Sequence, residues 1–317
     1  MDRLRRSLAA ALTATLCTGI ALPAAAQATR IKALVQGVAS QPVYMARDMG
    51  IFARHGLEVE IAPAPTADAM VPQLLSGQAQ VALTSGLAVV NAASKGLKVK
   101  LFASALNTSS AVPSSARLVV PQDSPIRSIA DLKGKSVAMG GLRSQPHLLV
   151  MAGARDHGVD PASISFVEIP VTSMQAAAQK GTMDAVYPFE PYLSAMLRGG
   201  FRLVEPNLTK YMEGAPVISF AASTEYLEKN PAVIRSFVAA ISEAYELANR
   251  DPQLVRDVDL KYTKLPPEFI RSRDIAPFSA VIDPIALGQL AQRMKDFGWI
   301  PHIPPMQDLV DAHAVTK

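Results

Sequence analysis

Short apolar strands alternate with helices in two stretches of the chain, first over residues 31–103 and again over residues 136–187. In both stretches a helix ends at a glycine, Gly77 or Gly181, and a short apolar strand begins three or four residues later. Strands that alternate with helices of this length form parallel sheets with helices on both faces. The repeat predicts two α/β lobes on one plan, although short αβ units also resemble one another by chance.

The two stretches are separated by a polar, serine-rich segment over residues 106–116, which we interpret as a linker or a ligand-lining loop. Apolar segments at 117–120 and 215–222 are predicted to be strands that cross between the lobes, and a strand at 201–205 is predicted to leave the second lobe. After residue 223 the chain is almost wholly helical, with a long amphipathic helix over 231–250. Two crossings predict a two-segment hinge and a cleft between the lobes.

We place the boundaries of the first lobe at residues 27–118 and 214–317, and those of the second lobe at 119–213. Residues 1–26 are predicted to be a secretory signal peptide, because three arginines precede an apolar run and an Ala-x-Ala cleavage signature. The run is too short for a dependable membrane anchor. Lipid attachment at Cys17 is an alternative, which the large Leu16 before it disfavours. The mature protein is therefore expected to be exported and periplasmic.

Composition excludes several classes of function. Cys17 is the only cysteine, so a mature chain without it has neither disulfides nor thiolate chemistry. The formal net charge of +4 falls to about +2 when the three arginines and one aspartate of residues 1–26 are removed, and aromatic residues are sparse. This composition disfavours nucleic-acid binding. The histidines are scattered without ligand-like spacing and no catalytic motif occurs, so we expect no metal, no cofactor and no enzymatic activity.

The stretch 135–150 is the most informative candidate for a site. A short apolar strand leads into Gly140 and Gly141, where a chain can need positive φ or close backbone approach. Ser144 and a following proline favour the start of a helix. Free N–H groups at a helix start attract anions, and Arg143 adds a positive charge. We interpret the turn as the cradle for the polar end of a small ligand; the alternative is an ordinary connection with a surface arginine.

The chain also resembles a known family. Six segments carry the resemblance: Pro42-Val-Tyr-Met-Ala-Arg-Asp-Met-Gly-Ile-Phe52, Gly56-Leu-Glu-Val59, Gly77-Gln-Ala-Gln-Val-Ala82, Ser128-Ile-Ala-Asp-Leu-Lys-Gly-Lys-Ser-Val137, Asp184-Ala185 and Glu190-Pro191-Tyr192. In order and spacing they are similar to those of periplasmic substrate-binding proteins of ABC importers, in the branch that binds nitrate, sulfonates, taurine and thiamine-pyrimidine precursors. Members often have tryptophan where this chain has Phe189, and its one tryptophan, Trp299, lies far away in the sequence.

The resemblance implies a type II periplasmic binding fold, in which each of two lobes is a mixed, mostly parallel sheet flanked by helices and two segments cross between them. It implies that a small organic anion, a sulfonate or a carboxylate, binds as the lobes close, and that a monomer delivers it to an ABC permease. An enzyme on the same fold, similar to a pyrimidine synthase, and a sensor that presents ligand to a membrane receptor are the alternatives. The expected ligand contacts are Ser40, Gln41, Tyr44, Thr84, Ser85 and Gly86 on the first lobe, and Gly140, Gly141, Arg143, Ser144, Gln145, Phe189 and Glu190 on the second.

Arg143 and His147 each have more than one expected role. Arg143 contacts the anionic group of the ligand, pairs with Glu190, or is a solvated side chain. His147, one turn into the helix, is expected to be structural or to lie at the rim rather than to act in catalysis.

Overall fold

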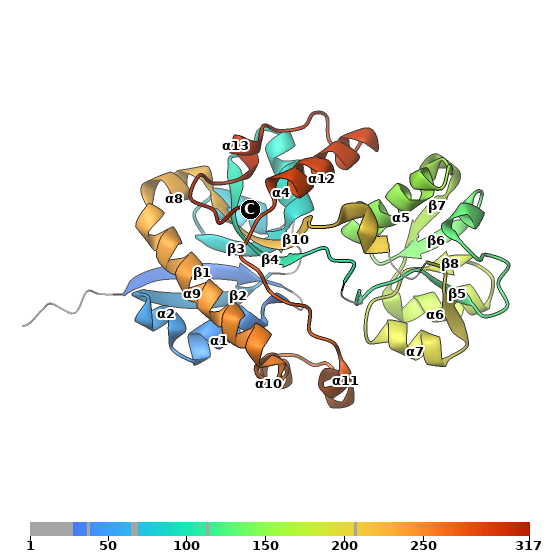
Figure 1. The fold of residues 1–317 in the computed structure, drawn as a ribbon, viewed down its shortest axis with the longest axis horizontal. Coiled ribbons are helices and arrows are strands. Elements are labelled where there is room, and N and C mark those ends of the chain that lie inside the picture. Colours follow the sequence, from blue (N-terminus) through green and yellow to red (C-terminus); the bar gives the residue numbers. More distant parts are fainter. Residues whose placement is uncertain (1–27, 37–38, 65–68, 112–113, 206–207) are drawn as a thin grey trace, which may run out of the picture.

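A computed structural model describes residues 28–36, 39–64, 69–111, 114–205 and 208–317. The predicted signal segment, including Cys17, lies outside these residues. The chain forms two α/β lobes joined by two chain segments (Figure 1), as the alternation of strands and helices predicts. Among the described helices, none is both long enough and apolar enough to cross a membrane.

The first lobe is built on a five-stranded sheet with the order β2-β1-β3-β10-β4. Strand β1 is parallel to β2 and β3, whereas β10 lies antiparallel between β3 and β4. The strands are β1 (Thr29–Val35), β2 (Leu57–Pro63), β3 (Val81–Ser85), β4 (Val99–Asn107) and β10 (Pro216–Ser223). The sheet is flanked by α1 (Gln41–Asp48), α2 (Ile51–Arg54), α3 (Met70–Leu75), α4 (Gly86–Ser94), α8 (Thr224–Lys229) and α9 (Pro231–Arg250), with α10 (Pro252–Tyr262), α11 (Pro267–Ser272), α12 (Pro284–Asp296) and α13 (Met306–Leu309) following.

The second lobe repeats this plan, with the order β7-β6-β8-β5-β9. Strand β6 is parallel to β7 and β8, and β5 is antiparallel to both β8 and β9. The strands are β5 (Val119–Pro121), β6 (Ser136–Met139), β7 (Ser165–Glu168), β8 (Ala185–Val186) and β9 (Phe201–Leu203). The main helices are α5 (Gln145–Asp156), α6 (Val171–Gln179) and α7 (Tyr192–Arg198), and the short 3-10 turn η4 (Leu208–Met212) lies on the return path to the first lobe.

Three predicted strand roles are wrong. The segments expected to cross between the lobes, 117–120 and 215–222, supply β5 and β10, which are inserted into the sheets. The segment 201–205, expected to leave the second lobe, contributes β9, which pairs with β5. The strands are inserted because an unpaired strand edge leaves backbone groups without partners, which pairing satisfies. The two segments between the sheets meet at Thr108, whose N–H donates to the Ala215 carbonyl at 2.8 Å.

The long helix α9 anchors the core of the first lobe through one aromatic side chain. The ring of Phe237 is fully buried and contacts Phe52, Phe102 and Phe220, with centroids 5.4, 5.9 and 5.0 Å away. Burying a side chain of this size contributes roughly 1.5–3 kcal/mol. The predicted apolar face of this helix therefore packs against the sheet, and the sheet can hold its strand ends in fixed positions.

The C-terminal part of the chain also contacts the second lobe. Helix α12 packs against α5 and η4, and Figure 1 shows it reaching across from the first lobe. Arg155 on α5 forms an ion pair with Asp296 at 3.2 Å. Trp299, which is remote from the predicted site in the sequence, packs against His147 with ring centroids 5.2 Å apart.

Candidate functional site

The predicted ligand contacts follow the carboxyl ends of parallel strands in both sheets. In the second lobe, Gly140 follows β6 and Phe189 follows β8, and these strands are neighbours. A Cβ atom placed on Gly140 would lie 3.8 Å from Cε1 of Phe189, so the phenyl ring lies close to the glycine turn. Ligands of open α/β sheets bind outside such carboxyl ends. The structure thus brings the two predicted loops of the second lobe together.

The turn at 140–144 is held by bonds within the protein. The N–H of Arg143 donates to Nδ1 of His147 at 3.0 Å, and the N–H of Leu142 donates to Oε2 of Glu168 at 3.0 Å. Ser144 is at the N-cap position of α5, but its hydroxyl donates to the Gly141 carbonyl at 2.7 Å. Because the N–H groups of Leu142 and Arg143 already donate to side chains of the protein, a ligand would have to compete with Glu168 and His147 for them.

The left-handed residue of this turn is Arg143, with φ of 55°, whereas neither Gly140 nor Gly141 has a positive φ. Positive φ, one of the two expected reasons for these glycines, is therefore wrong. The other, close backbone approach, is not seen either, because a Cβ atom on Gly140 would meet only side-chain atoms within 4 Å and one on Gly141 would meet none. A non-glycine residue in the left-handed region is uncommon and carries a conformational cost. The bond from the Arg143 N–H to the imidazole of His147 offsets that cost.

His147 is a buried, structural residue. Its ring packs against Phe166 and Trp299, with centroids 4.2 and 5.2 Å away. Burial, and to a smaller extent the positive charge of Arg143, lowers the pKa of His147 to about 4. At neutral pH the imidazole is therefore uncharged, and Nδ1 accepts the N–H of Arg143 while the proton resides on Nε2.

Glu190 is not the partner of Arg143. Its Oε1 accepts the hydroxyl of Ser194 at 2.8 Å, and its Oε2 accepts the N–H of Ser194 at 3.1 Å. Arg143 is exposed and forms no ion pair with any residue that the structure describes. The alternative in which these two side chains neutralise each other is absent from this structure, and a ligand contact by Arg143 stays a prediction.

Two large apolar side chains lie exposed on the same edge of the second lobe. Phe189 is 47% exposed and makes an edge-on contact with Tyr192, and Leu142 is 42% exposed. Exposed apolar groups next to charged ones suit a ligand with an apolar body and a charged end. An exposed apolar surface formed by Phe189 and Leu142 beside the charged Arg143 suits an organic anion better than an inorganic one, which has no apolar part.

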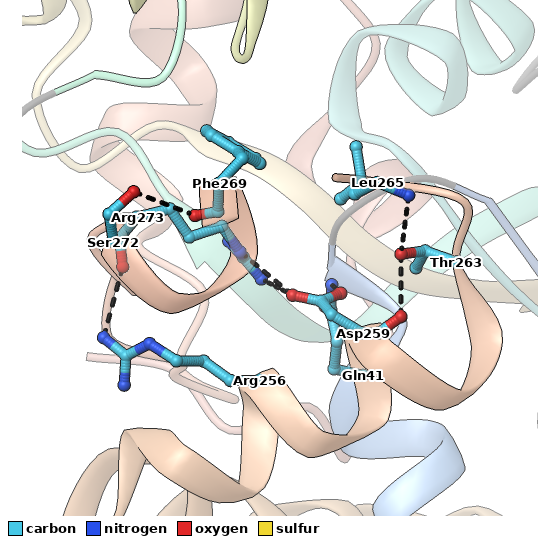
Figure 2. Close-up of polar contacts among 8 residues, drawn as sticks. All are labelled: Gln41, Arg256, Asp259, Thr263, Leu265, Phe269, Ser272 and Arg273. Atoms are coloured by element: carbon cyan, nitrogen blue, oxygen red, sulfur yellow. Dashed lines mark hydrogen bonds and ion pairs between the residues drawn. The ribbon is translucent and has the colours of Figure 1, made fainter. Parts of the chain in front are cut away.

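On the first lobe, Gln41 belongs to a buried polar network. Gln41 is 1% exposed, and its Nε2 donates to Oδ1 of Asp259 at 2.7 Å. Oδ2 of Asp259 accepts Nε of Arg273 at 2.9 Å, as Figure 2 shows. The neighbouring Ser40 is the N-cap residue of α1. The network fixes the start of α1 to α10 and to the residue after α11.

Tyr44 is also held by α10. Its ring stacks on Tyr262 with centroids 4.4 Å apart, and the guanidinium of Arg47 lies 5.2 Å from the Tyr44 ring. Asp48 accepts bonds from Arg47, Lys261 and Tyr262, which lower its pKa to about 2 although burial opposes the shift. The C-terminal helices therefore position the first-lobe residues that precede and begin α1.

The three predicted residues at the end of β3 differ in their surroundings. Thr84 is fully buried within the sheet, and Ser85 caps α4 by accepting the N–H of Leu87 at 3.2 Å. A Cβ atom on Gly86 would lie 2.3 Å from the carbonyl oxygen of Pro216. Glycine at this position is thus explained by the close approach of β10.

Gln145 links the second lobe to the first crossing segment. Its Nε2 donates to Oγ1 of Thr108 at 3.3 Å, and the same hydroxyl donates to the Ala215 carbonyl at 3.1 Å. A predicted ligand residue is therefore bonded to the point where both crossing segments meet.

Arg117 is a candidate that the sequence reasoning missed. It precedes β5, and its N–H donates to the Pro188 carbonyl at 3.3 Å, next to the isolated bridge between Ala116 and Phe189. Its presence beside Phe189 depends on β5 running antiparallel next to β8. The segment was predicted as a crossing strand, so no sequence signal pointed to this position.

The described residues also contain a cavity of about 390 Å³ elsewhere on the first lobe, between α4, the start of β4, α8 and the C-terminal segment. Its charged lining residues are Lys98, Lys100, Glu228 and Asp308. Over the same described ranges, no group of three or more histidine, cysteine, aspartate or glutamate side chains is arranged to hold a metal ion.

Comparison with known proteins agrees with this architecture. The structure resembles that of the periplasmic aliphatic sulphonate binding protein SsuA from Escherichia coli, with a TM-score of 0.74, 22% identity and coverage of 89% of this chain and 98% of that one. The fold is thus that of the periplasmic binding proteins. A family model described as NMT1/THI5 like matches residues 38–254, and the chain belongs to this family.

Two curated Escherichia coli K12 proteins are similar in sequence. One, named for binding aliphatic sulfonates, is 33% identical over 133 residues, which is 42% of this chain and 40% of that protein. The other, a taurine-binding periplasmic protein, is 26% identical over 232 residues, which is 71% of this chain and 69% of that protein.

Proposed function

We propose that this protein is an extracytoplasmic solute-binding protein that captures a small organic anion, a sulfonate or a carboxylate, between its two lobes. The observation that carries the proposal is the edge of the second lobe, where the exposed ring of Phe189 lies beside Gly140 and its backbone pairs with Ala116. Arg143 follows the same glycine turn and Arg117 follows Ala116, and neither arginine has a carboxylate partner among the described residues. The names of the similar proteins, which refer to sulfonates and taurine, support the same ligand class.

We further propose that the protein works in the periplasm and delivers its ligand to an ABC permease. The predicted signal peptide and the periplasmic similar proteins support this location. The mechanism is hinge closure: ligand bound to the loops of one lobe is enclosed when the other lobe rotates toward it, and the closed form is the one that docks. The two segments that meet at Thr108 supply the axis.

The test is calorimetric titration of the mature protein with matched anionic and neutral compounds. We expect 1-butanesulfonate or benzenesulfonate to bind saturably, and the corresponding sulfonamides to bind at least tenfold more weakly, since they lack the charge that strengthens hydrogen bonds to arginine. Equal affinity for sulfonate and sulfonamide would contradict an anion site. Formation of a product during incubation would favour the enzyme alternative instead.

A further inference from the structure

Arg117 lies on the same edge of the second sheet as the two predicted ligand loops. Val119 pairs with Val186, and the ladder continues toward Phe189 through the N–H of Arg117 and the carbonyl of Pro188. Strand β8 lies between β6 and β5 in the sheet. Since neighbouring strands are about 4.8 Å apart, the glycine turn, the Phe189 loop and Arg117 follow one another along this edge.

The guanidinium of Arg117 is held in place but has no counter-charge among the residues that the structure describes. Its Nε donates to the Ser114 carbonyl at 3.3 Å, and the residue is half-buried. Among the described residues, neither Nη atom has an acceptor and no carboxylate lies within ion-pair distance. A tethered guanidinium with both Nη atoms available presents the fork that binds sulfonate or carboxylate oxygens, and partial burial strengthens such a contact.

In the described part of the chain, the surroundings supply no other partner for this charge. The nearby Tyr187 is fully buried, and burial raises its pKa so that the phenol stays neutral, although the charge of Arg117 opposes that rise. The carboxylate of Glu190 accepts two bonds from Ser194, and that of Glu168 accepts the N–H of Leu142.

Arg143 is the weaker candidate for the same role. It is exposed, its guanidinium has no tether among the described residues, and its charge acts on His147, which packs against Phe166 and Trp299. Arg143 therefore lies on the α5 side of the glycine turn, whereas Arg117 adjoins the loop that contains Phe189.

We propose that Arg117, rather than Arg143, is the main anchor for the anionic group of the ligand, and that the apolar body of the ligand lies on Phe189. This inference rests on the proposed function. It assigns charge recognition to a residue that enters the second lobe from the first crossing segment, so the group that binds the ligand is directly connected to the hinge.

The test compares four variants by calorimetry with 1-butanesulfonate, benzenesulfonate and the carboxylate benzoate. The variants are Arg117→Gln, Arg117→Lys, Arg143→Gln and, as a control, Arg198→Gln. Arg198 is the last residue of α7, which runs away from the Phe189 loop. We expect Arg117→Gln to weaken binding roughly 10- to 100-fold, the range for a lost hydrogen bond to a charged group. Arg117→Lys should recover only part of the affinity, because lysine keeps the charge without the fork.

Arg143→Gln should lose less affinity than Arg117→Gln, and Arg198→Gln should match the wild type. Circular dichroism tests whether each variant is folded. If Arg117→Gln does not fold, the affinity of Arg117→Lys still tests the role of the guanidinium. Wild-type affinity in Arg117→Gln, or a larger loss in Arg143→Gln, would overturn the inference while the proposed function stands. If the wild-type protein binds no sulfonate or carboxylate, the proposed function itself fails.

Discussion

The imidazole of His147 packs against the indole of Trp299 with ring centroids 5.2 Å apart, and this contact joins the first turn of α5 to the residues after α12. Nδ1 of the same imidazole accepts the N–H of Arg143. The C-terminal segment of the chain therefore supports the glycine turn of the opposite lobe, and His147 is the residue through which it does so.

Stability should fall as pH decreases from about 6.5 toward 4. His147 has a pKa of about 4 in the folded protein, against 6.5 as its ordinary value, so the unfolded chain binds a proton more readily between these limits. The contribution of the uncharged His147 to the free energy of unfolding is complete above pH 6.5. It is lost as the pH falls to about 4, the pKa of His147 in the folded protein. We expect the free energy of unfolding to decrease by about 3 kcal/mol, measured by urea titration across this range.

His147→Asn is the matched variant for this pH dependence. Asparagine keeps an acceptor close to the position of Nδ1 but does not titrate, so the decrease between pH 6.5 and 4 should be largely absent. Equal pH dependence in the variant and the wild type would show that other groups are responsible. Asp48 is not among the candidates, because its pKa of about 2 places its effect at lower pH.

Replacement of Gly86 by alanine should destabilise the first lobe. The added methyl group would lie 2.3 Å from the carbonyl oxygen of Pro216, so β3 and β10 would have to separate. Overpacking of this kind costs about 1–3 kcal/mol, which a denaturant titration detects. Gly141→Ala is the control, since its Cβ atom meets nothing within 4 Å and its φ is not positive. Equal stability of the two variants would contradict the geometry at Pro216.

Replacement of Asp259 by asparagine should be strongly destabilising. Asp259 is fully buried and pairs with Arg273, so the substitution leaves a largely buried guanidinium without a counter-charge. We expect a loss of about 3–5 kcal/mol in the free energy of unfolding. Asp257→Asn, on the same helix but exposed, should change stability by less than about 0.5 kcal/mol. A small effect at Asp259 would mean that the ion pair contributes little to holding α10 against Gln41.

Ligand addition should make the molecule more compact. Closure about the segments that meet at Thr108 brings the lobes together, and small-angle scattering would report a smaller radius of gyration at saturating sulfonate. Gln145→Ala removes the bond to Thr108 and should alter the extent of closure without affecting the lobes themselves. An unchanged radius in a protein that demonstrably binds ligand would argue against hinge motion.

Much of the fold follows from local sequence patterns. The alternation of strand and helix depends on side chains two, three and four residues apart, and this spacing identifies the two lobes and the face of α9 that Phe237 occupies. Glycine and proline mark the turn that leads into α5 in the same way. Such signals also identify the glycine turn at 140 and the loop at Phe189 as strand-to-helix connections.

The arrangement of partners distant in the sequence required the tertiary structure. Gln41 and Asp259 are 218 residues apart, and β10 reaches β3 only after the whole second lobe has intervened. The period of the apolar residues predicts that a segment is a strand, but it does not predict which strand of the sheet it pairs with. The pairing depends on which backbone groups of the other strands are left without partners. The insertion of β5 beside β8 therefore decides that Arg117 lies next to Phe189, while the sequence by itself determines only that an arginine precedes an apolar strand.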